Sequence, residues 1–410
     1  MSGPSSYSRK HLRGTPGRGH PPAKTDPVAL LRVATVNAGP RAMLMDRLVN
    51  ATGAVRSEAT IQSDVRMLLL DPMLGLAEQD LEVDLETHVG HGRRIDVEVG
   101  RTVIEVKRTL ASPTAIAAAH AQLAGYVTTR STDMGQRYVG ILTDGRLWIA
   151  YHEVDGDLAE ATRTTSTPGT TGAEDLLRWL EGVLATQTSI RPTPDEIAKR
   201  LGATSSSHAL DYSTLAAIYD NGKDLPTVRL KRELWVKLLR GALGTQFVDD
   251  DGLFLEHTLL VNSAEIIAHL VLGLDAEDLG PATLLSGDQF AVAGLHGVVD
   301  RDFFDWVIEV PGGHSYITSM ARRLARFDWS AVEHDVLKVL YESVISAETR
   351  KALGEYYTPD WLANRIVTEA VTDPLNQRVL DPAIMRNFYV SRDTVHRERL
   401  SSRQAAYTFA

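Results

Sequence analysis

Three charged side chains, Asp96, Glu105 and Lys107, have the types and the spacing that could hydrolyse a phosphodiester bond. Two carboxylates held close together repel each other unless a cation bridges them or one of them binds a proton. A hard divalent ion such as Mg²⁺ accepts such oxygens together with a backbone carbonyl, here that of Val106, and waters. The ion would activate a water and polarise a phosphoryl oxygen, and the ammonium could orient that water or offset developing phosphate charge.

A β-hairpin must bring these side chains together. Apolar and polar residues alternate on both sides of Gly100-Arg101, which predicts two strands joined by a two-residue turn. This turn fixes the register, which pairs Val97 with Ile104 on the core face and Asp96 with Glu105 on the other face. The two carboxylates are then expected about 5 Å apart, with the lysine two residues farther along.

The same charges have a second interpretation, as the solvated face of an exposed hairpin. In that case Asp96, Glu98, Glu105 and Lys107 form ordinary cross-strand charge pairs. An acidic pair followed by a lysine arises often in charged sequences. The hairpin alone therefore leaves both interpretations open, and the surrounding sequence has to separate them.

The combination of Asp96 with Glu105-Val106-Lys107 resembles the PD-(D/E)xK nuclease signature, in which a hairpin presents the metal ligands. The resemblance implies that Asp96 and Glu105, with the Val106 carbonyl, bind Mg²⁺ and that Lys107 is catalytic. Glu58 matches the position of a further acidic residue that those nucleases direct toward the metal. The alternative for Glu58 is a helix N-terminal charge favoured by the helix dipole.

Two more segments support this resemblance. Gln122-Leu-Ala-Gly-Tyr126 is similar to the Gln-x-x-x-Tyr element that borders the active site in one branch of the superfamily, and its end residues share one helical face. The stretch from Tyr138 to Trp148 resembles the closing strand pair of these domains. Gln122 and Tyr126 could also be helix residues that simply pack against the sheet.

The elements expected around the hairpin form an α/β domain. Their periodicity predicts helices between about 29 and 70, strands at 81–89, 94–99 and 103–110, a helix at 113–126, and a hairpin at 138–142 and 146–151.

The composition limits the remaining possibilities. Because the chain has no cysteine, any metal must be bound by oxygen or imidazole ligands. The formal net charge of −10 argues weakly against nonspecific coating of nucleic acid, although a local basic face can be hidden in this sum. No apolar run is long enough to span a bilayer, and the beginning of the chain is basic and Gly/Pro/Ser-rich, so we expect a cytoplasmic protein without membrane contact.

A second resemblance lies near the end of the chain. Leu353 to Ala363, followed by Arg378 to Ala383, looks like the entry to an adenine-N6 DNA methyltransferase. Thr358 would cap a helix that Pro359 begins, and the free N–H groups there suit the carboxylate of S-adenosylmethionine. The resemblance makes Tyr357, Thr358, Pro359 and Asp381 a vestigial cofactor site.

The cofactor site is incomplete in this sequence. The family pattern requires a glycine-rich turn after Ala383, where this chain has Ile384 to Tyr389, and no Asn-Pro-Pro-Tyr segment follows. We therefore expect a truncated or split methyltransferase. S-adenosylmethionine would act only in an intact relative or with a complementing partner.

The expected architecture is a PD-(D/E)xK-like α/β domain, a mainly helical connector and an incomplete α/β methyltransferase start, as in single-chain restriction-modification enzymes. The predicted parts are a disordered basic tail (1–26), the nuclease-like domain (27–187), a linker (188–209), the connector (210–350), the methyltransferase fragment (351–383) and a non-matching tail (384–410).

The leading functional hypothesis is a Mg²⁺-dependent, type II-like restriction endonuclease module for phage defence. Its expected partners are double-stranded DNA and a separately encoded methyltransferase or target-recognition subunit. The alternative is an inactive or split adenine-specific methyltransferase or restriction subunit that binds DNA or a partner methyltransferase without cutting by itself.

Overall fold

The computed structural model describes residues 39–50, 56–79, 81–89, 93–243, 247–276, 278–292, 294–295, 299, 301–332, 335–353 and 360–371. The predicted basic tail at 1–26 and the non-matching tail at 384–410 lie outside the described residues. Most of the predicted methyltransferase fragment also lies outside them.

A six-stranded mixed sheet forms the first half of the chain, with its strands in sequence order. Its strands are β1 (Val83–Val89), β2 (Arg93–Val99), β3 (Thr102–Val106), β4 (Val139–Thr143), β5 (Leu147–Val154) and β6 (Asp157–Thr165). Only β3 and β4 pair in parallel, and every other neighbouring pair is antiparallel. A parallel pair needs a crossover connection, and helix α3 (Pro113–Met134) supplies it.

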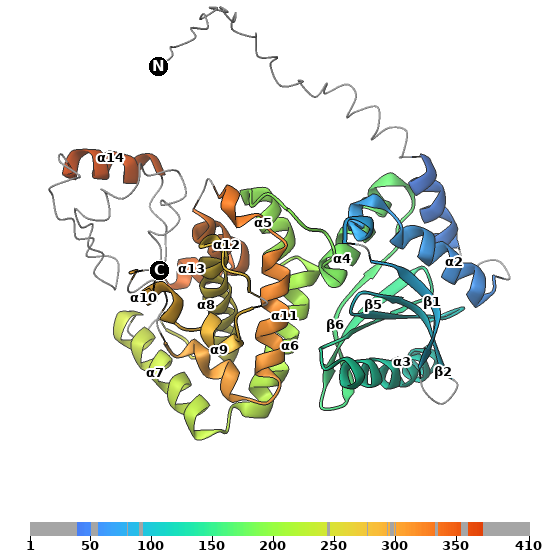
Figure 1. Cartoon of the computed structure of the whole chain (residues 1–410), viewed down its shortest axis with the longest axis horizontal. Helices are drawn as coiled ribbons and strands as arrows, with labels where there is room; N and C mark the ends of the chain where they lie inside the picture. Colours follow the sequence, from blue (N-terminus) through green and yellow to red (C-terminus); the bar gives the residue numbers. More distant parts are fainter. Residues whose placement is uncertain are drawn as a thin grey trace, which may run out of the picture.

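Helices cover both faces of this sheet (Figure 1). On one face α3 packs against a cluster that includes Val103 and Leu142. On the other face α2 (Glu58–Leu69) and α4 (Gly169–Leu184) pack against a second cluster that includes Val97 and Ile104. This layering confirms the expected α/β class, and it explains why all five residues of β3 are buried.

The predicted hairpin register is confirmed at the turn end. Val97 pairs with Ile104, Glu98 with Val103 and Val99 with Thr102. Gly100 at the turn has a φ of 56°, a left-handed conformation that favours glycine and suits a two-residue hairpin turn.

Two stretches differ from the sequence-based prediction. The polar strand β6 was missed, because it is an edge strand in which only Leu158 is buried and alternating polar residues resemble a loop. The predicted linker at 188–209 contains helix α5 (Pro194–Leu201), whose Ile197 belongs to the core of the helical part. Thr193 caps α5 by accepting the Glu196 N–H, which orders this segment.

The second half of the chain is mainly helical, as expected for residues 210–350. Its α-helices are α6 (Ser206–Gly222), α7 (Pro226–Leu243), α8 (Asp251–Val271), α9 (Pro281–Leu284), α10 (Asp288–Val292), α11 (Gly313–Ala325), α12 (Val336–Val344), α13 (Ala347–Leu353) and α14 (Asp360–Ala370). The short 3₁₀ turns of the chain are η2 (Pro72–Leu74), η3 (Leu76–Gln79), η5 (Phe304–Glu309) and η6 (Trp329–Ala331). Among the described helices, none combines the length and the apolar character needed to cross a membrane.

A buried ion-pair network joins the two halves. Glu181 of α4 accepts hydrogen bonds from Arg326, which follows α11, and from Arg200 of α5. Glu181 and Arg326 are each only 3% exposed. A buried charge that loses its partner destabilises the folded state. This network therefore stabilises the junction between the sheet part and the helical part only while the Glu181 carboxylate and the arginine guanidinium groups are all present.

We expect Glu181→Ala to lower the free energy of unfolding by about 3 to 5 kcal/mol, because it leaves Arg326 buried without a counter-charge. Urea denaturation followed by circular dichroism measures this change. The control is Arg178→Ala on the same helix, which removes an exposed pair with Asp175 and should cost less than about 1 kcal/mol. Equal effects of the two variants would contradict a structural role for the buried network.

Candidate active site

The predicted carboxylates lie where the ladder between β2 and β3 ends. The last paired residues are Val97 and Ile104. Beyond them the Asp96 side chain takes the place of a ladder partner, because its Oδ2 accepts the Val106 N–H at 2.8 Å. Gln62 of α2 holds the same strand from the helix side by donating to the Asp96 carbonyl at 2.6 Å. The strands therefore separate next to the two carboxylates, and Asp96 is fixed against the backbone of β3.

Buried Glu105 forms an ion pair with the partly exposed Lys107. The Glu105 residue is 0% exposed, and its Oε1 accepts a hydrogen bond from the Lys107 ammonium. Its other oxygen, Oε2, is buried and has no hydrogen-bond partner within the described residues. Glu98 is also buried and pairs with Arg130. The interpretation of this hairpin as a solvated face is therefore wrong, because α3 covers the face that carries these acids.

Burial makes the carboxylates hold protons more tightly than usual. Desolvation, together with repulsion from Asp96, raises the pKa of Glu105 from 4.5 to about 7, although Lys107 opposes the shift. Desolvation also raises the pKa of Asp96, against the Val106 N–H and Lys107, while Glu58 and Glu86 add to the rise. A second cation near these acids would relieve the same repulsion.

Lys107 remains an ammonium at this site. Burial alone would lower the pKa of Lys107, but its hydrogen bond to Glu105 and the charges of Glu105, Asp96 and Glu58 outweigh burial and raise it. Lys107 is therefore suited to donate hydrogen bonds and to offset negative charge, and not to accept a proton near neutral pH.

Glu58 stands beside this group on the first turn of α2. Ser57 caps the helix by accepting the Thr60 N–H, which fixes where α2 begins. The Glu58 Oε1 accepts the Arg108 N–H at 3.2 Å and so ties α2 to the segment that follows β3. Its side chain is exposed, and its charge acts on Asp96, Glu105 and Lys107.

An open cleft of about 610 Å³ borders the group. Glu58, Lys107, Arg108 and Gln122 line it, together with small alanine side chains of α3. The cleft therefore carries both signs of charge next to the buried carboxylates, and its alanine wall leaves room for a bulky ligand.

Gln122 and Tyr126 occupy one face of α3, as predicted, but in different surroundings. Gln122 is exposed at the cleft, whereas Tyr126 is only 4% exposed, and the Gln122 amide donates to the Tyr126 hydroxyl at 3.2 Å. The helix can lie this close to the sheet because of Gly140, where a Cβ would meet the Leu123 side chain at 2.9 Å. Tyr126 thus holds the Gln122 side chain from the core side.

One positioning residue was missed by the sequence analysis. Asp144, which lies between the predicted strands at 138–142 and 146–151, is 5% exposed and accepts the Leu110 N–H at 2.8 Å. Its other oxygen accepts the N–H groups of Arg146 and Leu147. Asp144 therefore ties the segment after Lys107 to the β4–β5 turn. An Asp before Gly in a tight turn could have signalled this anchoring role.

The carboxylates at this site suit a small Mg²⁺ ligand set better than a large one. Within the described residues, no group of three or more His, Asp or Glu side chains is arranged to hold a metal ion. A Mg²⁺ site in proteins commonly uses one or two carboxylates, with waters completing its shell. Asp96 and the unpartnered Glu105 Oε2 fit that smaller set. The predicted S-adenosylmethionine residues Tyr357, Thr358, Pro359 and Asp381 lie outside the described residues.

Comparisons with known proteins give one likeness of low similarity. No family model and no curated protein matches the chain. Among solved structures, the cryo-electron microscopy structure of a DrdV–DNA complex is similar at 16% identity and a TM-score of 0.22, over 84% of this chain and 33% of that chain. The chain thus spans about a third of that protein's length. At this score the likeness does not establish a shared fold.

We expect Glu105→Gln to become more stable than the wild type as the pH rises in metal-free buffer. Because the pKa of Glu105 is raised from 4.5 to about 7 by folding, the wild type loses stability as the pH rises between these two values. Glutamine does not titrate. The difference in unfolding free energy, variant minus wild type, should grow by on the order of 3 kcal/mol between about pH 4 and pH 8. Urea titrations at several pH values measure it, and a constant difference would contradict the raised pKa.

Proposed function

We propose that this chain is a metal-dependent endonuclease that hydrolyses DNA phosphodiester bonds. The observation that carries the proposal is the pair of buried Glu105 with partly exposed Lys107, which lies beside Asp96 and borders an open cleft. Removing charges from water carries a desolvation penalty, and clusters of such charges with shifted pKa values occur often at functional sites. The α/β layering and the order of the elements are compatible with a nuclease-like domain.

The residues that would hold Mg²⁺ are Asp96 and Glu105, with the Val106 carbonyl. The bound ion would supply a water of lowered pKa and an electrophile for a phosphoryl oxygen. Asp96 is held by the Val106 N–H, so its carboxylate is already oriented before an ion arrives. Pre-orientation of this kind reduces the reorganisation that binding would otherwise require.

Lys107 would act on the phosphate and on the attacking water. Its ammonium stays protonated, so it donates hydrogen bonds and stabilises the negative charge that grows on the phosphoryl oxygens. Glu105 keeps the ammonium close to the carboxylates through their hydrogen bond. Glu58 adds negative charge near the metal side and, through Arg108, fixes the wall of the cleft.

The cleft has features that suit a nucleic-acid backbone. Arg108 and Lys107 supply positive charge for phosphates, and Gln122 supplies an amide held by Tyr126. We assign double-stranded DNA as the substrate. The wider assignment, to a restriction-modification protein whose helical connector works with a methyltransferase or a target-recognition subunit, rests on the order of the sequence motifs.

We expect the purified chain to nick unmethylated plasmid or phage DNA in the presence of Mg²⁺ or Mn²⁺. Asp96→Asn and Lys107→Ala should each lower the cleavage rate by about a hundredfold or more, because they remove groups that act on the reacting phosphate. Matched controls are Asp175→Asn and Lys199→Ala, whose side chains are exposed on α4 and α5 and which should cleave like the wild type.

Several outcomes of this assay distinguish the hypotheses. Loss of cleavage in both site variants, with both controls active, supports the hairpin as the catalytic site. Equal cleavage by all five proteins would indicate a contaminating nuclease. No cleavage by folded wild type, with either metal, would contradict the proposal and favour the alternative of a subunit that binds DNA or a partner without cutting.

Metal binding can be tested without catalysis. A ligand that binds only the folded state raises the melting temperature, so Mn²⁺ at millimolar concentration should stabilise the wild type. Asp96→Asn should abolish most of this shift, whereas Asp175→Asn should retain it. Thermal denaturation at about pH 8 measures the effect, since there Glu105 has lost its proton. An equal shift in all three proteins would place the metal elsewhere.

A further inference from the structure

A second cavity lies between the sheet and the helical part, away from the cleft described above. Its volume is about 550 Å³, within the range of sites for small molecules. Its walls come from the β2–β3 turn at Gly100 and Arg101, from the start of β4 at Val139, and from α11 at Tyr316 and Arg323. This cavity is called the junction crevice below.

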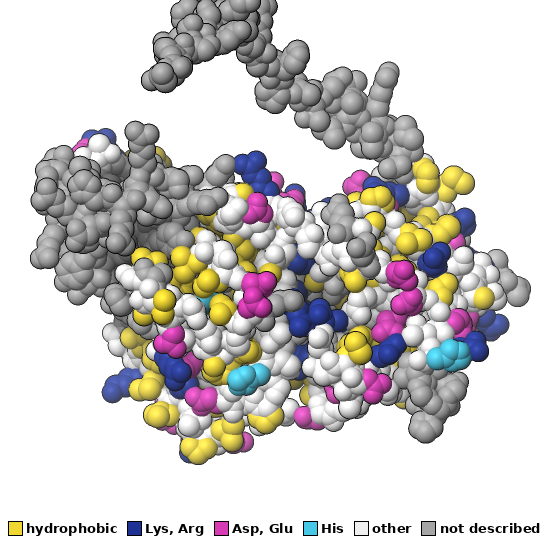
Figure 2. Space-filling view, in the orientation of Figure 1, with side chains coloured by type: hydrophobic (Ala, Val, Ile, Leu, Met, Phe, Trp, Pro, Cys, Tyr) yellow, Lys and Arg dark blue, Asp and Glu magenta, His cyan; other side chains and the backbone are white. Residues whose placement is uncertain are grey.

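The junction crevice carries positive charge. Arg101, Arg137, Arg322 and Arg323 line it, and no Asp or Glu is among the described residues that form its lining. Arg323 is paired with Asp211, and Arg101 donates to Gln136, so these guanidinium groups are held in place. Arginine and lysine side chains also gather at the boundary of the two halves in Figure 2. This concentration stands out in a chain with a formal net charge of −10.

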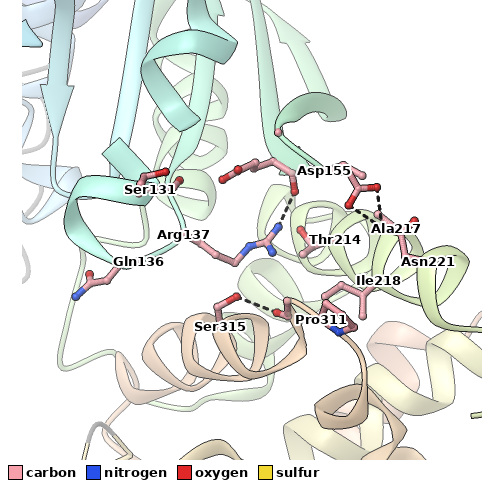
Figure 3. A pocket seen from close by; sticks show the side chains of 16 residues that line it. Ser131, Gln136, Arg137, Asp155, Thr214, Ala217, Ile218, Asn221, Pro311 and Ser315 are labelled. Atoms are coloured by element: carbon pink, nitrogen blue, oxygen red, sulfur yellow. Dashed lines mark hydrogen bonds between the residues drawn. The ribbon is translucent and has the colours of Figure 1, made fainter. Parts of the chain in front are cut away.

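Arg137 is a partly buried cation of this crevice. Its side chain reaches from the end of α3 into the space between the sheet and the helices (Figure 3), and its guanidinium donates to the Glu153 carbonyl at 2.9 Å. No ion pair to Arg137 is found among the described residues. Burial lowers the pKa of Arg137, Glu153 opposes this, and the nearby Arg323 lowers it further. An anion bound here would offset the desolvation cost of the Arg137 charge and its repulsion from Arg323.

A buried hydroxyl faces the same place. Tyr316 is 0% exposed, it lines the crevice, and its Oη has no hydrogen-bond partner within the described residues. Burial and the neighbouring Asp211 raise the pKa of Tyr316, so the hydroxyl keeps its proton. A buried donor without an acceptor costs free energy, which a ligand oxygen would recover.

The crevice and the candidate active site lie at opposite ends of the same strand. Thr102, the first residue of β3, lines the crevice, whereas Glu105 and Lys107 lie at the other end of that strand. The neighbouring strand β4 repeats this arrangement, because Val139 lines the crevice and the Thr143 carbonyl accepts the Lys107 N–H. The crevice and the catalytic cleft are therefore separate sites, and a phosphate bound in one would not occupy the other.

We propose that the junction crevice binds a small phosphate-bearing anion of nucleotide size, with Arg137 and the Tyr316 hydroxyl as its main donors. A second cavity of about 410 Å³ shares Gln136, Arg137 and Thr214 with the crevice, so a ligand has room on both sides of the guanidinium. The apolar lining from α3 and α4, at Met134 and Leu184, suits a base or sugar beside the phosphates. This inference does not depend on the nuclease proposal.

Isothermal titration calorimetry with the full chain tests the site. ATP, GTP, AMP and pyrophosphate serve as probes, with a short DNA duplex as a competitor. We expect at least one nucleotide to bind, with affinity falling about tenfold or more in Arg137→Gln and several-fold in Tyr316→Phe, because each variant removes a donor to a charged group. Tyr316→Phe removes no hydrogen bond to any of the described residues, so it should fold normally. Arg163→Gln, on the exposed edge strand β6, is the control and should bind like the wild type.

Three outcomes would overturn the proposal: no binding of any probe by folded wild type at millimolar concentration, binding that survives Arg137→Gln unchanged, or competition by the duplex at nucleotide-like affinity. The last result would make the crevice part of a DNA surface. Competition between pyrophosphate and a nucleotide in the wild type, lost in Arg137→Gln, would support recognition through the phosphates.

Discussion

The repulsion between Asp96 and Glu105 is the constraint around which the sheet part is organised. Glu105 has no exposure to solvent, so water can screen the pair only from the side of the partly exposed Asp96, and the protein supplies compensation itself. Lys107 gives one charge, and the Val106 N–H gives one hydrogen bond. These contacts exist only because β3 lies between two neighbours and under α3, which requires the crossover that the parallel β3–β4 pair imposes. The helices on both faces of the sheet therefore keep the Glu105 carboxylate out of contact with water.

The sequence predicted the parts of this arrangement that depend on local rules. Alternation and a two-residue turn were enough for the β2–β3 register, because a shift by one residue would expose Val97 and Ile104. Other features depend on tertiary contacts. The ladder ends beyond Val97 because the Asp96 side chain captures a backbone N–H, and no periodicity encodes this event. The strand β6 was missed because only Leu158 in it is buried, so its pattern differs little from that of a polar loop.

The candidate site was predictable to a similar degree. Residue types and spacing were enough to group Asp96, Glu105, Lys107, Glu58 and Gln122. In the structure Glu58, Lys107 and Gln122 line one cleft, Glu105 pairs with Lys107, and Asp96 contacts the neighbouring Val106 N–H. The supporting residues could not be chosen in the same way. Gln62 acts through a backbone group far away in the sequence, and such a contact carries no residue-type signature. The Asp-Gly pair at Asp144 signals a turn, but it does not reveal that the carboxylate accepts the distant Leu110 N–H. Burial of Glu105 was also not foreseeable, since it depends on α3 lying close to β4 at Gly140.

The glycine turn at Gly100 and the short strand after it have an evolutionary consequence. Side chains of β3 alternate between two differently filled faces, so the loss or gain of a single codon between Thr102 and Lys107 would exchange Ile104 and Glu105. The same change would also shift the residues that line the junction crevice. Length variation should therefore accumulate elsewhere. At the exposed β5–β6 turn around Gly156, added residues would displace neither face of the sheet and would alter only the wall of the cavity of about 410 Å³ beside Arg137.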